Sequence, residues 1–97
     1  PTVLLIEDHE PNRYLVTFLL ENAGMTVIAA SDGRRGLEAA ADWTPSIILL
    51  DIQLPTMDGY AVARGLRALP HLSRTPIVAV TSYAMPGDRE KALDAGC

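Results

Sequence analysis

Several residue types and patterns are scarce or missing in this 97-residue sequence, and each absence excludes a class of protein. Cys97 is the only cysteine, so these residues form no internal disulfide and fit a reducing compartment, which predicts a cytoplasmic location. The two histidines, His9 and His71, are far apart and do not give the spacing of a zinc site. No apolar run approaches the roughly 20 residues that a membrane-spanning helix needs.

Basic side chains are also few. Lys and Arg together number 8 and Asp and Glu number 12, so the formal net charge is −4. This acidic balance argues against a broad surface for nucleic acid or for an anionic membrane, and we expect neither as a direct partner. The hydrophobic share of 48% is enough for a packed core, and the length suits one domain over residues 1–97.

Four short apolar runs predict β-strands at 3–6, 26–29, 47–50 and 77–80. The first, third and fourth runs are continuous, which is typical of strands covered on both faces. Apolar residues at helical spacing separate the runs, and residues 88–93 predict a fourth helix. The residues at this spacing are Val16, Leu19, Leu20, Ala23, Leu37, Ala40, Ala41, Val62, Gly65, Leu66 and Leu69. The alternation predicts an α/β fold with a parallel sheet and helices on both faces.

Acidic and hydroxyl side chains follow three of the predicted strands. Glu7 and Asp8 come after the first run, Asp51 after the third, and Thr81 and Ser82 after the fourth. Parallel sheets collect ligands at the carboxyl ends of their strands, so these groups converge if the three strands are neighbours. Three close carboxylates repel one another unless a cation neutralises them. Hard oxygen ligands without imidazole or thiolate favour Mg²⁺.

Each of these side chains also has a simpler local explanation. Asp8, His9 or Glu10 could cap a helix that begins at the following proline. Asp51 could bond loop amides at the end of its strand. Thr81 could be an ordinary residue of a strand-to-helix loop. The combination of all these side chains at strand ends is less expected by chance than any one of them.

The arrangement resembles the receiver domain of bacterial response regulators. The resemblance rests on the acidic pair Glu7–Asp8 after an apolar strand, on residues 51–59 (DIQLPTMDG) and on residues 80–82 (VTS). It extends over the whole chain, and residues 85–88 (MPGD) also match the family. Asp51, Pro55 and Gly59 form the most specific part.

The resemblance implies a role for each matching residue. Asp51 would be the phosphoacceptor, receiving its phosphoryl group from a histidine kinase or a phosphotransfer protein. Asp8 and Asp51 would ligate Mg²⁺ directly, together with the backbone carbonyl of Gln53, and Glu7 would act through metal-bound water. Thr81 would turn its hydroxyl to the phosphoryl oxygens and switch partner binding. Helix residues such as Arg13 and Tyr14 would face the phosphodonor.

The resemblance also implies the fold and one departure from it. We expect a flavodoxin-like, three-layer α/β/α domain with strand order 2-1-3-4, counted along the chain. The family has a fifth strand and helix, with a lysine on that strand, after the position of Cys97, so we expect the domain to be C-terminally incomplete. Lys91, the only lysine, lies on the predicted fourth helix and cannot be assumed to replace it. Residues 77–80 would then form a bare edge prone to self-association.

Three other functions stay open. A degenerate receiver that serves as a binding scaffold is disfavoured by the retained acids. A Mg²⁺-dependent hydrolase is disfavoured because Gln53 stands where a second acid would complete a D-x-D pair. A nucleotide or flavin binder is disfavoured because no G-x-G-x-x-G follows the first strand. We therefore predict a signalling module that catalyses only its own phosphorylation and dephosphorylation, not a conventional enzyme.

Overall fold

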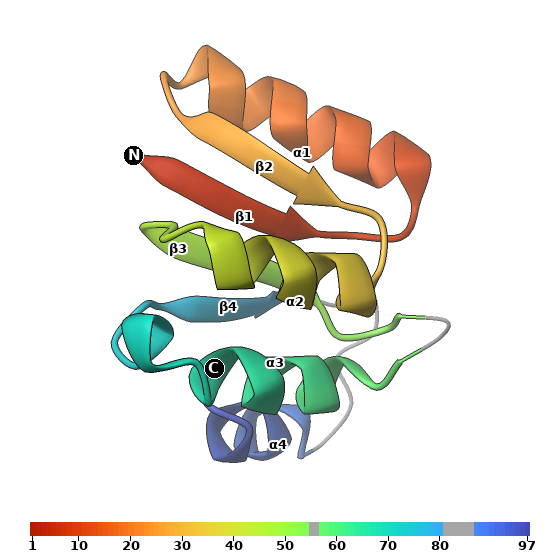
Figure 1. Cartoon of the computed structure of the whole chain (residues 1–97). Coiled ribbons are helices and arrows are strands. Elements are labelled where there is room, and N and C mark those ends of the chain that lie inside the picture. Colours follow the sequence, from red (N-terminus) through yellow and green to blue (C-terminus); the bar gives the residue numbers. More distant parts are fainter. Residues whose placement is uncertain (55–56, 81–86) are drawn as a thin grey trace.

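Strands and helices alternate along the chain as predicted. The structure is a computed structural model that describes residues 1–54, 57–80 and 87–97. Figure 1 shows the elements, which are β1 (Thr2–Ile6), α1 (Glu10–Asn22), β2 (Thr26–Ala30), α2 (Gly33–Asp42), β3 (Ile47–Asp51), α3 (Gly59–Arg67), the short 3₁₀ helix η1 (Pro70–Leu72), β4 (Ile77–Val80) and α4 (Asp88–Asp94). Within these ranges, no helix combines the length and the apolar character needed to cross a bilayer.

The four strands form one parallel sheet in the order β2-β1-β3-β4, which confirms the predicted fold class and strand order. Ile6 of β1 pairs with Leu50 of β3, and Asp51 of β3 pairs with Val80 of β4. The carboxyl ends of β1, β3 and β4 therefore lie at one edge of the sheet. This register places the residues that follow β1 next to the last residue of β3.

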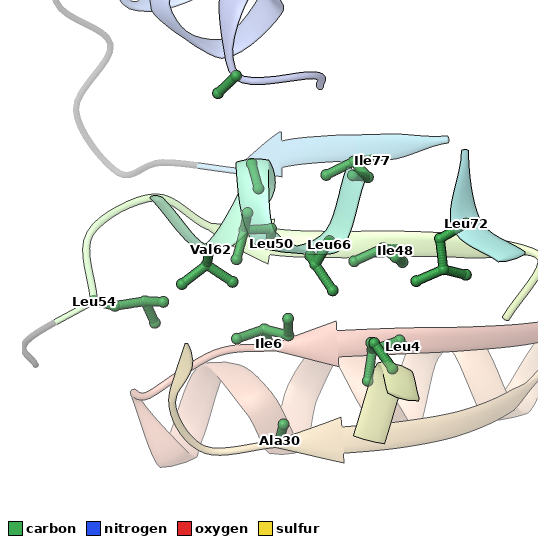
Figure 2. Close-up of a cluster of buried hydrophobic side chains, with 13 residues drawn as sticks. Leu4, Ile6, Ala30, Ile48, Leu50, Leu54, Val62, Leu66, Leu72 and Ile77 are labelled. Atoms are coloured by element: carbon green, nitrogen blue, oxygen red, sulfur yellow. The ribbon is translucent and has the colours of Figure 1, made fainter. Parts of the chain in front are cut away.

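The main core lies between the sheet and the helices α2 and α3. Alternate residues of the two central strands, Leu4, Ile6, Ile48 and Leu50, are almost completely buried on this face. Figure 2 shows them pointing toward the same space as the α3 side chains around Leu66. The helical stripe predicted for α3 is confirmed, and it anchors this helix against the sheet.

Helix α1 faces the sheet with a side that only partly matches the one predicted. Val16 and Leu20 are partly buried, but Leu19 is 56% exposed and no residue of α1 is fully buried. Arg13 and Thr17, which are partly buried, share the inward side of the helix with Val16 and Leu20. The apolar spacing therefore predicted only part of the contact face, because it left out the partly buried polar residues Arg13 and Thr17.

Strand β4 corrects the expectation that the fourth apolar run is covered on both faces. It is an edge of the described sheet, and Val78 and Val80 are 43% and 51% exposed. Exposure alternates along the strand, because Ile77 is buried while Val78 and Val80 face a side that the described helices leave open. Self-association through this edge stays a prediction, which sedimentation velocity over a range of concentrations would measure.

Candidate functional site

The loop between β1 and α1 carries the first two acidic residues. The backbone N–H of Glu7 donates to the carbonyl of Ala30 at 3.1 Å, which extends the β1–β2 pairing by one residue. Helix α1 begins at Glu10, with a proline in its first turn, and its N-cap is His9, which makes no side-chain capping hydrogen bond. The capping explanation for Asp8 is therefore wrong, and its carboxylate is available for another role.

Asp51 is the last residue of β3. Its Oδ1 accepts a hydrogen bond of 2.9 Å from the backbone N–H of Gln53, so the prediction that it bonds a loop amide is confirmed. The N–H of the next residue, Ile52, donates to the carbonyl of Val80 at 3.0 Å. These bonds hold the turn after β3 and orient the Asp51 carboxylate, so the local explanation and a functional one are compatible.

The acidic side chains of the two loops meet at this edge of the sheet. Carboxylate oxygens of Glu7, Asp8 and Asp51 all lie within 4.8 Å of one another. They line an open cavity of about 280 Å³. Among the described residues, its lining consists of Glu7, Asp8, His9, Asn12, Asp51 and Gln53. The structure thus brings together the three acids that the sequence singled out.

This environment disfavours the charged form of Asp51. Burial and the side-chain hydrogen bond with Glu7 raise the pKa of Asp51 from 3.8 to about 6, although the Gln53 amide opposes this shift. The charge of Glu7 acts in the same direction as burial. Without a neutralising cation, Asp51 therefore keeps its proton up to about pH 6.

The raised pKa of Asp51 predicts how the stability of the metal-free chain depends on pH. The folded state holds the Asp51 proton up to about pH 6, whereas the unfolded state releases it near pH 3.8, so stability falls as pH rises through this window. We expect the stability advantage of Asp51→Asn over the parent to grow between about pH 4 and 6 and then level off. Urea denaturation of both proteins with EDTA present measures this difference.

Two outcomes of that pH series are informative. Parallel stability curves for the two proteins would contradict the raised pKa of Asp51. Excess Mg²⁺ should reverse the advantage at pH 7, because a cation bound to the folded state alone stabilises it. The two proteins differ in sequence only at position 51, so the difference reports the titration of Asp51 together with its interaction with Glu7.

The residues of the cluster fit a hard divalent cation. All three side chains offer carboxylate oxygens, which Mg²⁺ prefers. Among the described residues, no histidine nitrogen or cysteine sulfur lies close enough to join these three carboxylates as a metal ligand. The Oε2 atom of Glu7 is buried and has no hydrogen-bond partner among the described residues. The cavity has room for the several waters that Mg²⁺ retains, at about 30 Å³ each.

The other predicted site residues differ in what the structure says of them. Gln53 is exposed and lines the cavity. Pro55, Thr81 and Ser82 lie outside the described residues. Gly59 is buried at the first position of α3, where its N–H donates to the carbonyl of Ile52.

Sequence reasoning missed one cavity residue and one side-chain contact in this region. Asn12 lines the cavity, and Arg13 donates from Nη1 to the backbone carbonyls of Glu7 and Asp8. The predicted place of Arg13 on the surface that faces the phosphodonor stays a prediction, and in the structure its Nη1 atom is directed to the β1–α1 loop. Its sequence position could have indicated this contact. Arg13 lies one helical turn after His9, and side chains on a helix tilt toward its N-terminus, which here is the β1–α1 loop.

Comparisons with known proteins agree with this geometry. Residues 3–97 match the model of the response regulator receiver domain family. The chain is 38% identical over 96 residues to the polar-differentiation response regulator DivK of Brucella anthropi, covering 99% of this chain and 78% of DivK. It is 39% identical over 95 residues to the histidine-protein kinase BarA of Escherichia coli K12, covering 98% of this chain but 10% of BarA.

Solved structures show the same fold. Chemotaxis protein CheY4 of Vibrio cholerae superposes with a TM-score of 0.95 at 28% identity, over 99% of this chain and 80% of CheY4. The receiver domain of the sensor histidine kinase PA1611 of Pseudomonas aeruginosa, which has a magnesium ion coordinated in its active-site cleft, gives 0.89 at 37% identity, over 98% of this chain and 78% of that one. The chain therefore belongs to the response regulator receiver domain family, whose members are phosphoacceptor modules of two-component signalling.

Proposed function

We propose that Asp51 is the residue of this chain that accepts the phosphoryl group. The observation that supports this proposal is the meeting of the Glu7, Asp8 and Asp51 carboxylates within 4.8 Å at the carboxyl ends of β1 and β3. Asp51 ends β3, which lies between β1 and β4 in the sheet. Its carboxylate is oriented by the Gln53 amide and opens to the cavity.

The same cluster would hold the Mg²⁺ ion that receiver domains bind at an acidic site. We assign direct coordination to Asp8 and Asp51 and to the backbone carbonyl of Gln53, with Glu7 acting through a metal-bound water. The unpartnered Oε2 atom of Glu7 and the magnesium ion in the cleft of the PA1611 receiver domain support this assignment. When bound, the ion supplies charge neutralisation for the approach of an anionic phosphoryl group to three acids.

The residues of the site then carry out a simple transfer. One carboxylate oxygen of Asp51 forms a bond to phosphorus while the bond from phosphorus to a donor histidine nitrogen breaks, and the imidazole leaves with that electron pair. A carboxylate is a weak nucleophile, so positioning of Asp51 accounts for much of the catalysis. We further assign Thr81 as the hydroxyl that bonds the transferred group and passes the change to partner-binding surfaces.

Receiver domains interact with histidine kinases or phosphotransfer proteins, and we propose that this chain meets its donor along α1. Tyr14 and Phe18 are 73% and 51% exposed on this helix, and their rings stack with centroids 6.5 Å apart. The helix begins directly beside the acidic cavity, so a partner lying along it could present a histidine to Asp51. We propose that the chain acts in the cytoplasm and that it catalyses only its own phosphorylation and dephosphorylation.

The proposed function predicts an acid-stable, base-labile adduct when the chain meets a small phosphodonor. Incubation with acetyl phosphate and Mg²⁺ should add one phosphoryl group, because an acyl phosphate forms on a carboxylate. Intact-mass spectrometry measures the adduct, and EDTA should abolish it. An equal yield of adduct with and without EDTA would exclude a role for the metal ion.

If the chain binds Mg²⁺ but acetyl phosphate does not label it, the result would favour the scaffold alternative. In that alternative, the domain binds a partner without accepting a phosphoryl group. Partner affinity with and without the phosphoryl mimic beryllofluoride separates the two functions further. Equal affinity in both conditions would favour the passive module. Hydrolysis of a phosphodiester by the chain would instead support the hydrolase that the sequence left open.

A further inference from the structure

Arg13 makes contacts that neither the metal site nor the donor surface explains. Its Nη1 atom donates to the backbone carbonyl of Glu7 at 2.9 Å and to that of Asp8 at 3.3 Å. The residue is placed by the first turn of α1, where its own backbone N–H donates to the carbonyl of His9 at 2.9 Å. One guanidinium nitrogen thus bridges consecutive peptide groups of the loop that carries two acids of the cluster.

These contacts act where the strand ladder has ended. The pairing of β1 with β3 stops at Ile6, and the last backbone bond to β2 is the one from Glu7 to Ala30. Beyond that bond, the chain must turn toward α1 while it keeps both acidic side chains directed at Asp51. Fixing the carbonyls of Glu7 and Asp8 fixes the two peptide planes and hence the directions in which both side chains leave the backbone.

The loop needs such support because the acids repel one another. Without a cation, like charges within 4.8 Å tend to open the β1–α1 loop away from the end of β3. Asp51 is already held on its own side by the Gln53 amide. A charge-assisted hydrogen bond is stronger than a neutral one, so Arg13 can hold the β1–α1 loop in place against this repulsion.

We propose that Arg13 is a positioning residue that keeps Glu7 and Asp8 in the geometry that receives the metal ion. The proposal rests on the proposed function, since it assumes that these acids hold Mg²⁺. It does not require Arg13 to touch the ion or the phosphoryl group. Because its Nη1 atom bonds the loop, that atom is not free to contact the phosphodonor.

The sign of the effect on metal affinity separates positioning from simple electrostatics. The positive charge of Arg13 itself repels a cation, so its removal strengthens Mg²⁺ binding if charge is its only influence. If Arg13 holds the ligands in place, its removal weakens binding, because the ion must then order the loop. The two explanations predict opposite changes.

The first measurement is Mg²⁺ binding by isothermal titration calorimetry on the parent, Arg13→Met and Arg34→Met. Arg34 is the matched control: its side chain is 79% exposed on α2, where it pairs only loosely with Glu38. We expect Arg13→Met to bind about tenfold more weakly, equivalent to about 1.4 kcal/mol, and Arg34→Met to bind like the parent. Unchanged or tighter binding by Arg13→Met would overturn the proposal.

A second measurement does not depend on the metal. The amide of Glu7 should exchange its hydrogen faster in metal-free Arg13→Met than in the parent or Arg34→Met, because the loop opens more often. Equal exchange in all three proteins would show that Arg13 does not hold the loop. If the parent fails to bind Mg²⁺, the proposed function fails, and the exchange rates still decide whether the loop is held.

A conservative variant covers the case in which Arg13→Met does not fold. Arg13→Lys keeps the charge and the apolar stem but replaces the planar fork with a single ammonium group. We expect Arg13→Lys to bind Mg²⁺ more weakly than the parent and to exchange the Glu7 amide hydrogen faster than the parent does. Affinity equal to or tighter than the parent's would overturn the positioning role.

Discussion

Replacing Asp51 with asparagine is expected to abolish phosphoryl labelling, with a loss on the order of a thousandfold or more. The side chain keeps its size, and its Oδ1 can still accept the bond from the Gln53 amide. The neutral amide lacks the carboxylate oxygen that forms the acyl phosphate, and it removes one of the three charges of the cluster. Intact-mass spectrometry after incubation with acetyl phosphate and Mg²⁺ measures the loss.

Asp58→Asn is a matched control for this experiment. Asp58 is the N-cap of α3, and its Oδ1 accepts from the N–H of Tyr60 at 3.0 Å. Asparagine caps helices as well as aspartate does, so this variant makes the same change of charge with little effect on the fold. We expect it to be labelled like the parent. Parent-level labelling of Asp51→Asn would instead place the acceptor on another residue.

Replacing Gly59 with alanine is expected to destabilise the fold by about 3 kcal/mol. A Cβ atom at this position would lie 2.4–2.7 Å from the backbone Cα, O and C atoms of Ile52. Backbone atoms cannot move aside as a flexible side chain can, so the segment after β3 must shift. Ile52 follows Asp51 directly, and the variant should therefore weaken Mg²⁺ binding as well as lower the urea midpoint.

The control for this substitution is Gly65→Ala in the same helix. Its Cβ would meet a terminal methyl of Leu37 at 3.1 Å, which is the end of a flexible side chain. Alanine in a helix interior gains up to about 1 kcal/mol over glycine, which offsets the tighter contact. We expect its stability to stay within about 1 kcal/mol of the parent's. A Gly59→Ala variant with the same urea midpoint as Gly65→Ala would contradict the close packing of α3 on Ile52.

The alternation of strands and helices could be predicted because it depends on local patterns. Apolar β-branched runs and helical spacing are properties of neighbouring residues, and they placed every described strand to within one residue of each end. The orientation of α1 and the exposure of β4 could not be predicted in this way. Leu19 and Val80 are as apolar as core residues, and they are exposed because no described element packs over their side chains.

The amino-acid sequence by itself determined which chemical groups stand at the ends of the strands, since Glu7, Asp8 and Asp51 each follow an apolar run. Only the tertiary structure decided that their oxygens lie within 4.8 Å, that the pKa of Asp51 rises to about 6, and that Arg13 bonds the loop of the other two. The physical reason is the distance along the chain over which each property is determined. A residue's chemistry is local, whereas burial, repulsion and hydrogen bonding between loops depend on how separate strands pair and how α1 packs beside them.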